Sequence, residues 1–205
     1  MTASAETSAS GSAGYRSERQ ITMSKRTTKS PGWSDVKARV SNLNQKQLLQ
    51  LVADLYRLSK ENREFIHARF SVGDDPLGPY KETISDCMYP DVYSNKPVQV
   101  AKARRAISSY SKATSDPLGE AELMTVLVEH GNRFTVDFGD MDGPFYDSLN
   151  RAYQQAIDKV LSLPQEQRDR FRERLEAIMK SSSGIGWGYH DALVDDYYRA
   201  FPQDE

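Results

Sequence analysis

The stretch that decides the fold is LNQKQLLQLVADLYRLS, residues 43–59. Its large apolar residues recur at steps of three and four, at Leu48, Leu51, Val52, Leu55 and Leu58. Residues at these steps lie on one side of an α-helix, whereas a half-buried strand would alternate strictly. Asn44 stands at the expected N-cap, and Gln47 three residues later completes a capping-box pattern. The stretch therefore predicts an amphipathic helix with Leu51 and Leu55 in the middle of its buried face.

The same helical periodicity continues along the chain, with turn residues between the segments. Helices are predicted over residues 60–70 after a Ser59 cap, and then over residues 79–88, 97–114, 115–131, 145–160, 164–180 and 187–201. Gly131 is expected to stop its helix, and residues 135–144 form a turn-rich connection with at most a very short extended piece. Because strand patterns are nearly absent, we predict an all-α domain of about seven to eight helices, as an irregular helical bundle or a short solenoid.

The first 32 residues differ in composition from the rest of the chain. Nineteen of them are Ser, Thr, Ala or Gly, and almost none is large and apolar. Such a segment cannot bury enough surface to offset its ordering entropy, so we expect residues 1–32 to be disordered and dispensable for folding. Met23, followed by SKRTTKSPGW, has the features of a native start. The predicted organisation is a leader over residues 1–32, one helical domain over residues 33–201 and a tail over residues 202–205.

The bulk composition narrows the class of protein. The 205 residues include a single cysteine, Cys87, which cannot form an intrachain disulfide and is expected to be a small buried thiol. This cysteine usage fits a reducing cytosol, and no run of 18 apolar residues could span a membrane. We therefore expect a cytoplasmic protein without a membrane partner.

The charges are distributed unevenly along the chain. Residues 1–115 contain 18 Lys and Arg against 11 Asp and Glu, whereas residues 116–205 contain 9 against 18. The basic side chains Lys102, Arg104, Arg105 and Lys112 fall within one predicted helix and are the candidate binding residues. A basic front and an acidic back favour a protein partner or self-association. Nucleic acid is the less favoured partner, because the pI is near 6.0 and no recognition motif is present.

The stretch GIGWGYHDALVDDYYRAF, residues 184–201, invites two chemical interpretations. Its glycines do not form a dinucleotide or phosphate loop, because a helix precedes them and no Walker lysine follows. An all-α metal-dependent phosphohydrolase is the alternative, with His130, His190 and Asp191 as metal ligands, but no distant later aspartate completes the set. We prefer a structural closing helix, with Gly184 as a stop, with Trp187, Val194 and Phe201 buried, and with Tyr197 or Tyr198 buried beside them. No cofactor is predicted.

The segment VDFGDMDGPFYD, residues 136–147, contains four aspartates: Asp137, Asp140, Asp142 and Asp147. It fails the pattern of a calcium loop, because Gly143 comes too early and no Glu closes the loop. Asp142 before Gly-Pro is better explained as a helix cap or turn residue. Weak binding of a divalent ion by the cluster stays open.

Several segments together resemble an uncharacterised bacterial family, a domain of unknown function. They are WSDVK, DLYRLSKENREFIHARF, PYKETISDCMYPDV, KARRAISSYSKA and GEAELMTVLVEHG, in order across most of residues 33–201. The resemblance implies a small, helical, cytoplasmic bacterial protein and transfers no catalytic residue. We therefore expect a non-enzymatic helical module that works by protein–protein contact or regulation, with the phosphohydrolase and nucleic-acid interpretations as alternatives.

Overall fold

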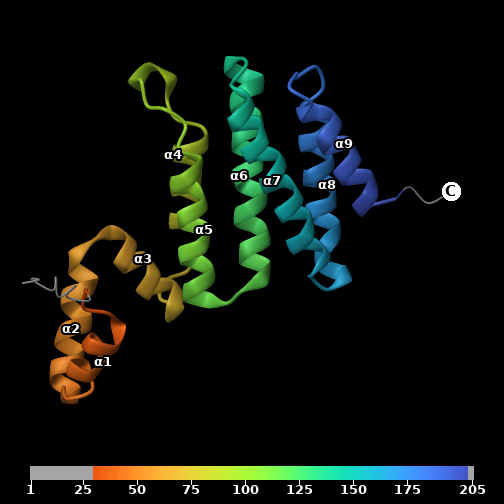
Figure 1. Ribbon diagram of the computed structural model, residues 1–205. Helices are drawn as coiled ribbons and strands as arrows, with labels where there is room; N and C mark the ends of the chain where they lie inside the picture. Colours follow the sequence, from red (N-terminus) through yellow and green to blue (C-terminus); the bar gives the residue numbers. More distant parts are fainter. Residues whose placement is uncertain (1–29, 203–205) are drawn as a thin grey trace, which may run out of the picture. The chain divides into compact units, whose positions relative to one another are not determined.

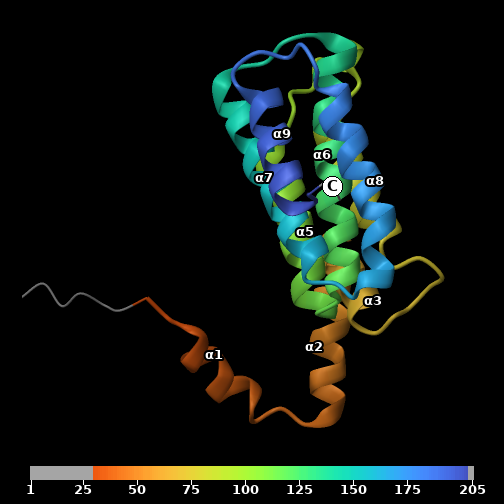
Figure 2. The same cartoon turned by 90° about the vertical axis from the view of Figure 1, so that its right-hand side faces the viewer.

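The computed structural model describes residues 30–202, and this part of the chain is helical without any strand (Figures 1 and 2). Its α-helices are α1 (Trp33–Val40), α2 (Gln45–Leu58), α3 (Lys60–Arg69), α4 (Gly78–Met88), α5 (Val100–Thr114), α6 (Pro117–Phe138), α7 (Gly143–Leu161), α8 (Gln165–Ser181) and α9 (Tyr189–Ala200), and one 3-10 turn, η1, spans Val92–Ser94. The all-α prediction is confirmed. The predictions for the leader and the tail fall mostly on residues 1–29 and 203–205, outside the described residues.

The internal contacts divide the chain into two units, one ending at Gln45 and the other beginning at Lys46. The described part of the first unit contains α1. Gly32 is the N-cap of α1, and the carboxylate of Asp35, three residues later, accepts a hydrogen bond from the Gly32 backbone N–H (2.8 Å). No residue of α1 is buried, and Trp33 exposes 71% of its surface.

The second unit is an irregular bundle with α6 at its centre. α6 packs against α4, α5, α7 and α8, and α9 packs against α7 and α8. In both ribbon views α6, α7 and α8 run side by side (Figures 1 and 2). The α6 side chains Leu123, Leu127 and Val128 have no exposed surface. No helix within residues 30–202 is both long enough and apolar enough to cross a membrane.

Local capping signals place the starts of several helices. Ser59 accepts a hydrogen bond from the backbone N–H of Asn62 (3.1 Å) at the start of α3. Asp116 caps α6 and Asp142 caps α7 in the same way. Since each cap satisfies a backbone N–H group that has no partner within its helix, these polar residues define the starts independently of the bundle. The predictions for Ser59 and Asp142 are confirmed.

The sequence predicts that Gly131 stops its helix, and this prediction is wrong. α6 continues to Phe138 and is followed by its C-cap Gly139 (φ +104°). Gly131 is buried where α6 meets its neighbours. A Cβ atom there would lie 2.6 Å from Leu149 Cδ2 and 2.9 Å from Met88 Cε. The glycine therefore allows α7 and α4 to approach α6 closely, and residues 135–138 are helical where a turn is predicted.

The prediction that Trp187 is buried is also wrong, because 62% of this residue is exposed. Trp187 precedes α9 in a left-handed conformation (φ +62°), so it does not share the helical face that packs on the bundle. That face contains Tyr189, Leu193, Tyr197 and Phe201, all of which are buried. The predictions for Tyr197 and Phe201 are confirmed, and Val194 is partly buried against the core.

Candidate interaction surface

Five apolar side chains cover one side of α2, and we call them the leucine face: Leu48, Leu51, Val52, Leu55 and Leu58. Each exposes at least 36% of its surface, and Leu58 exposes 75%. α2 has no buried residue at all. Contiguous apolar side chains left in solvent are typical of interaction sites, whereas isolated ones are ordinary surface residues.

The sequence correctly predicts this helix and wrongly predicts that it is part of the core. Leu55 is 45% exposed, and Leu51, the least exposed residue of the leucine face, is 36% exposed. The core is built by residues of α3 to α9 and the loops between them, with no side chain from α2 among its buried members. The periodicity of apolar residues identifies the face of a helix whose burial would be stabilising, but it does not identify the surface that covers this face.

Two side-chain contacts join α2 to the start of the bundle. The Tyr56 hydroxyl and His67 Nε2 on α3 lie 2.9 Å apart, and their rings are tilted at a centroid distance of 5.5 Å. The side-chain amide of Asn62 donates to the Leu55 carbonyl oxygen (2.7 Å). These contacts use Tyr56 and the backbone, so they leave the leucine face uncovered.

The polar side of α2 is nearly neutral and internally paired. The Gln50 side-chain amide donates to Asp54 Oδ1 (2.8 Å), and Arg57 Nη1 lies 3.4 Å from the same oxygen. Lys46 is the other charged residue of the helix. Because the charges are few and Asp54 already has partners, electrostatic attraction contributes little to whatever contacts this helix.

The predicted binding residues on α5 have separate roles. Arg104 holds α5 to α7, donating to Gln155 Oε1 (2.8 Å) and to the Ser148 carbonyl oxygen (3.1 Å). Burial lowers the pKa of the Arg104 guanidinium, and the nearby Arg151 lowers it further. Lys102, Arg105 and Lys112 are exposed, and the Arg105 Nε donates to the Ala101 carbonyl oxygen (3.2 Å). Arg104 is therefore a structural residue.

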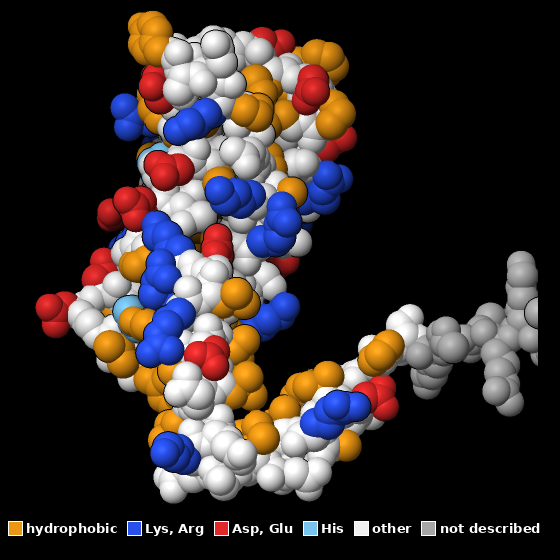
Figure 3. Space-filling view, turned by 90° about the vertical axis from the view of Figure 1, so that its left-hand side faces the viewer, with side chains coloured by type: hydrophobic (Ala, Val, Ile, Leu, Met, Phe, Trp, Pro, Cys, Tyr) orange, Lys and Arg blue, Asp and Glu red, His pale blue; other side chains and the backbone are white. Residues whose placement is uncertain are grey.

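A cavity of about 490 Å³ lies between α3, α4 and α5, and the candidate binding residues Lys102 and Arg105 contribute to its lining. Its charged lining residues are Lys60, Lys102, Arg105, Glu61, Glu64 and Asp86. Neither the buried Tyr80 hydroxyl nor Glu64 Oε1 forms a hydrogen bond, although Lys60 Nζ lies 3.5 Å from Glu64 Oε1. On the face drawn in Figure 3, Lys and Arg side chains are interspersed with acidic and hydrophobic ones. Such a mixed surface is unlike the continuous positive groove that tracks a nucleic-acid backbone.

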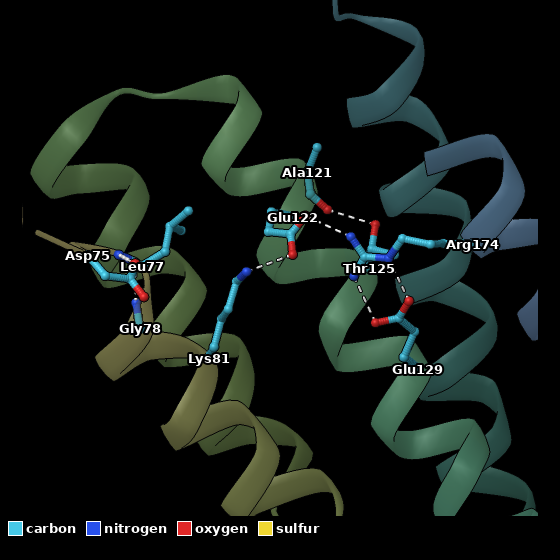
Figure 4. Close-up of polar contacts among 9 residues, drawn as sticks. All are labelled: Asp75, Leu77, Gly78, Lys81, Ala121, Glu122, Thr125, Glu129 and Arg174. Atoms are coloured by element: carbon cyan, nitrogen blue, oxygen red, sulfur yellow. Dashed lines mark hydrogen bonds and ion pairs between the residues drawn. The ribbon is translucent and has the colours of Figure 1, made fainter. Parts of the chain in front are cut away.

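A polar network ties three helices together beside the core (Figure 4). Arg174 on α8 donates to both oxygens of Glu129 (2.7 and 2.8 Å) and to Glu122 (2.7 Å), both on α6. Lys81 on α4 lies 2.8 Å from the other Glu122 oxygen. Hydrogen bonds to Glu129 raise the pKa of Arg174. Burial alone would raise the pKa of Glu122, but hydrogen bonds from Lys81 and Arg174 outweigh it and lower that pKa. The network is structural, because every charge in it is paired.

The histidines of the phosphohydrolase alternative have separate structural contacts. His130 lies beside Tyr89, with a ring-centroid distance of 6.3 Å, and burial lowers its pKa. His190 Nδ1 lies 2.8 Å from the Ser182 hydroxyl, and Asp191 is exposed. Within residues 30–202 no group of three or more His, Cys, Asp or Glu side chains could hold a metal ion. The structure thus does not bring His130, His190 and Asp191 together as a metal centre.

The aspartates of residues 137–142 are each engaged by the protein. Asp137 accepts hydrogen bonds from the Tyr89 hydroxyl (2.7 Å) and Arg133 Nε (3.1 Å). Asp140 accepts from Trp187 Nε1 (2.9 Å) and the Tyr146 hydroxyl (2.7 Å), and these bonds lower its pKa. These carboxylates tie the corner between α6 and α7 to its neighbours, a role that sequence reasoning missed because the partners are distant in the chain.

The comparisons with known proteins leave the family open. The chain matches no family profile, no curated protein and no solved structure. The resemblance to an uncharacterised bacterial family therefore stays a prediction. The leucine face is the most distinctive feature of the molecule's surface.

Proposed function

We propose that the protein is a non-enzymatic, cytoplasmic protein–protein interaction module that binds a helical partner through the leucine face of α2. The observation that carries this proposal is the exposure of all five aliphatic side chains on one helical face, next to a bundle whose core is complete without them. Burying a leucine side chain contributes about 1.5–3 kcal/mol, so covering this face would strongly favour association.

The state of Cys87 supports the cytoplasmic part of the proposal. This thiol is free, only 1% of the residue is exposed, and burial raises its pKa. A lone protonated thiol inside a core suits a reducing compartment, where no disulfide has to form.

The test changes the leucine face while keeping α2 helical. Gln has nearly the helix propensity of Leu, so the double variant Leu51→Gln, Leu55→Gln removes apolar surface without breaking the helix. Val136→Gln with Leu161→Gln is the matched control, because both are exposed aliphatic residues on other helices. Affinity capture from the native host, with mass spectrometry, compares the proteins bound by the two variants.

We expect the Leu51/Leu55 variant to lose partners that the wild type and the control variant retain. Both variants should keep the circular dichroism spectrum of a folded helical protein, because neither alters the core. An unchanged set of bound proteins, together with unchanged self-association, would exclude the leucine face as the interaction surface.

A further inference from the structure

Four residues of the leucine face follow a seven-residue repeat. Leu48, Leu51, Leu55 and Leu58 occupy the a, d, a and d positions of two heptads, and Val52 lies beside them at an e position. Apolar residues at this spacing form the seam between two paired helices, where each side chain enters a gap between side chains of the facing helix. The repeat therefore points to a helix as the occupant of this face.

The charges on α2 argue against a membrane or a nucleic acid as the occupant. Helices that lie on membranes carry a polar face rich in Lys and Arg, and phosphate contacts need mobile cations. α2 has Lys46 and Arg57 against Asp54, and Arg57 is paired with Asp54. Outside the leucine face, α2 otherwise carries three glutamines and Leu49, which is 64% exposed. Such a helix suits a partner helix that is itself apolar along the seam and nearly neutral on its flanks.

The other helices within residues 30–202 do not offer such a helix. α1 exposes Trp33 and Val36, but it has only eight residues and no leucine, so it is shorter than the leucine face, which runs from Leu48 to Leu58. Residues 1–29 contain no leucine. Every other α-helix of the second unit, α3 to α9, has buried residues and is already packed in the bundle. A second copy of the chain, however, brings a leucine face of the same size, equally uncovered and with the same near-neutral flanks. A contact between identical faces covers both at once, which is the property of a two-fold symmetric interface.

We propose that the leucine face is covered by α2 of a second copy of this chain, in an antiparallel pairing. This inference rests on the proposed function and names the partner. In a pairing centred at residue 53, Leu48 of one copy faces Leu58 of the other, and Leu51 of one faces Leu55 of the other. All four leucines are then buried in leucine-on-leucine layers, and no charged residue enters the seam.

The antiparallel orientation follows from the position of the bundle in the chain. α2 leads through the single residue Ser59 into α3, so the bundle begins where α2 ends. Paired helices lie about 8–10 Å apart, whereas a domain of this length has a radius of gyration of about 15 Å. Parallel pairing would crowd two bundles at the same end of the paired helices. Antiparallel pairing places them at opposite ends of a helix whose 14 residues span about 21 Å.

The first experiment measures the mass of the full chain by sedimentation equilibrium over a range of micromolar concentrations. We expect a concentration-dependent dimer. Leu51→Gln with Leu55→Gln removes four seam leucines from the dimer, so the dissociation constant should rise by at least about a hundredfold. Val136→Gln with Leu161→Gln should leave it unchanged. A wild-type chain that stays monomeric, or a control that dissociates equally, overturns the proposal.

The second experiment tests the orientation with cysteines at the ends of the seam. Cys87 is buried and is the chain's only cysteine, so an introduced cysteine is the accessible thiol. In the antiparallel pairing, Leu48→Cys and Leu58→Cys proteins cross-link when mixed, and neither cross-links with itself when a short bismaleimide is added. Self-cross-linking of each protein alone would show a parallel pairing and overturn the proposed arrangement.

The outcomes separate this inference from the proposed function. A monomeric chain whose Leu51/Leu55 variant loses a different protein partner excludes the second copy and retains the interaction module. A monomeric chain whose bound proteins do not depend on the leucine face excludes both. A monomeric chain that co-floats with anionic phospholipid vesicles through the leucine face also overturns the pairing proposed for α2.

Discussion

At the residue scale, Trp187 is attached to the protein by contacts at its edge. Its indole Nε1 donates to Asp140 Oδ2 (2.9 Å), and a Cβ atom added at Gly143 would lie only 3.3 Å from its ring. Most of the ring surface nevertheless faces solvent, with 62% of the residue exposed. The stabilising contribution of Trp187 is therefore one hydrogen bond and a partial surface contact. Leu193, one turn into α9, has no exposed surface.

Replacing Trp187 should cost far less than replacing a core residue of the same segment. We expect Trp187→Ala to lower the free energy of unfolding by about 0.5–1.5 kcal/mol, the usual net value of one hydrogen bond. Leu193→Ala should lower it by about 2–5 kcal/mol, because it leaves a cavity. Urea unfolding of both variants measures the difference, and an equal loss for the two would contradict the position of Trp187 on the surface.

Gly119 is required by close approach within the bundle. A Cβ atom at this position would lie 2.4 Å from the Tyr110 hydroxyl oxygen and 2.6 Å from Asp116 Oδ2. These two groups are joined by a hydrogen bond of 2.8 Å, and the Tyr110 ring is buried and stacks edge-on against Tyr80. Neither group can move aside without breaking that bond or the cap of α6.

Gly119→Ala should therefore destabilise the protein by about 1–3 kcal/mol, as overpacked sites do, despite the better helix propensity of alanine. Gly186→Ala is the matched control, because nothing lies within 4 Å of a Cβ atom there. Its free energy of unfolding should stay within about 0.5 kcal/mol of wild type. A neutral Gly119→Ala would show that the approach of Tyr110 is looser than described.

At the scale of elements, the bundle is joined by polar contacts as well as by its core. Arg174 connects α8 to two carboxylates of α6, and Glu122 in turn binds Lys81 of α4. The Glu122 side chain is only 14% exposed, so this carboxylate depends on its partners. In the folded protein burial alone would raise the pKa of Glu122, but the hydrogen bonds from Lys81 and Arg174 outweigh this effect and lower it.

The lowered pKa of Glu122 makes part of the stability depend on pH. A carboxyl whose pKa falls on folding stabilises the protein above its unfolded pKa, near 4.5, and this contribution is lost as the pH falls through the folded value. We expect Arg174→Gln to cost about 1–3 kcal/mol near neutral pH, because it removes the hydrogen bonds of a charged donor to Glu129 and to the largely buried Glu122. The difference in unfolding free energy between wild type and Arg174→Gln should shrink as the pH falls through the folded pKa of Glu122.

Urea unfolding of the wild type and of Arg174→Gln, at a series of pH values from neutral to acidic, measures this effect. Arg57→Gln is the control, because Arg57 forms an exposed ion pair with Asp54 at 3.4 Å. Exposed pairs contribute little, so its effect should stay below about 1 kcal/mol. A cost for Arg174→Gln that is constant with pH would mean that packing, and not the carboxylates, accounts for it.

At the scale of the whole molecule, the chain separates at Gln45 and Lys46 into two units. The large core lies in the second unit, and among residues 30–202 none of its buried members precedes Lys46. We therefore expect the described residues before α2, which include α1, to contribute little to the cooperative unfolding of the bundle. The sequence predicts that the leader over residues 1–32 is dispensable for folding, and a deletion that also removes α1 includes this segment.

A protein that begins at Gln45 should fold and keep its thermal midpoint to within about 4 °C, which corresponds to roughly 1 kcal/mol for a chain of this size. Differential scanning calorimetry at one protein concentration measures it, with the full chain as reference. A midpoint lower by about 10 °C would show that the first unit stabilises the second by several kcal/mol.

The sequence by itself determined the helices α2 to α9, to within a few residues at their starts, whereas α1 was not predicted. Helical periodicity, the Ser59 and Asp142 caps and the proline-containing first turns act through residues within four positions of each other, so they can be read without the fold. It also located the leucine face of α2, residue by residue. The candidate site was therefore visible in the sequence, although it was assigned to the core.

Only the tertiary structure decided what each face and each special residue does. The core closes without α2, which leaves Leu51 and Leu55 exposed. Gly131 allows close packing between helices and does not stop one, and Arg104 binds α7. These roles depend on residues that are distant in the chain, and no local sequence pattern specifies which distant residues will pack against a given helix. The sequence of a helix shows which of its sides is apolar. The packing of the other helices determines whether that side is covered within the chain or by another molecule.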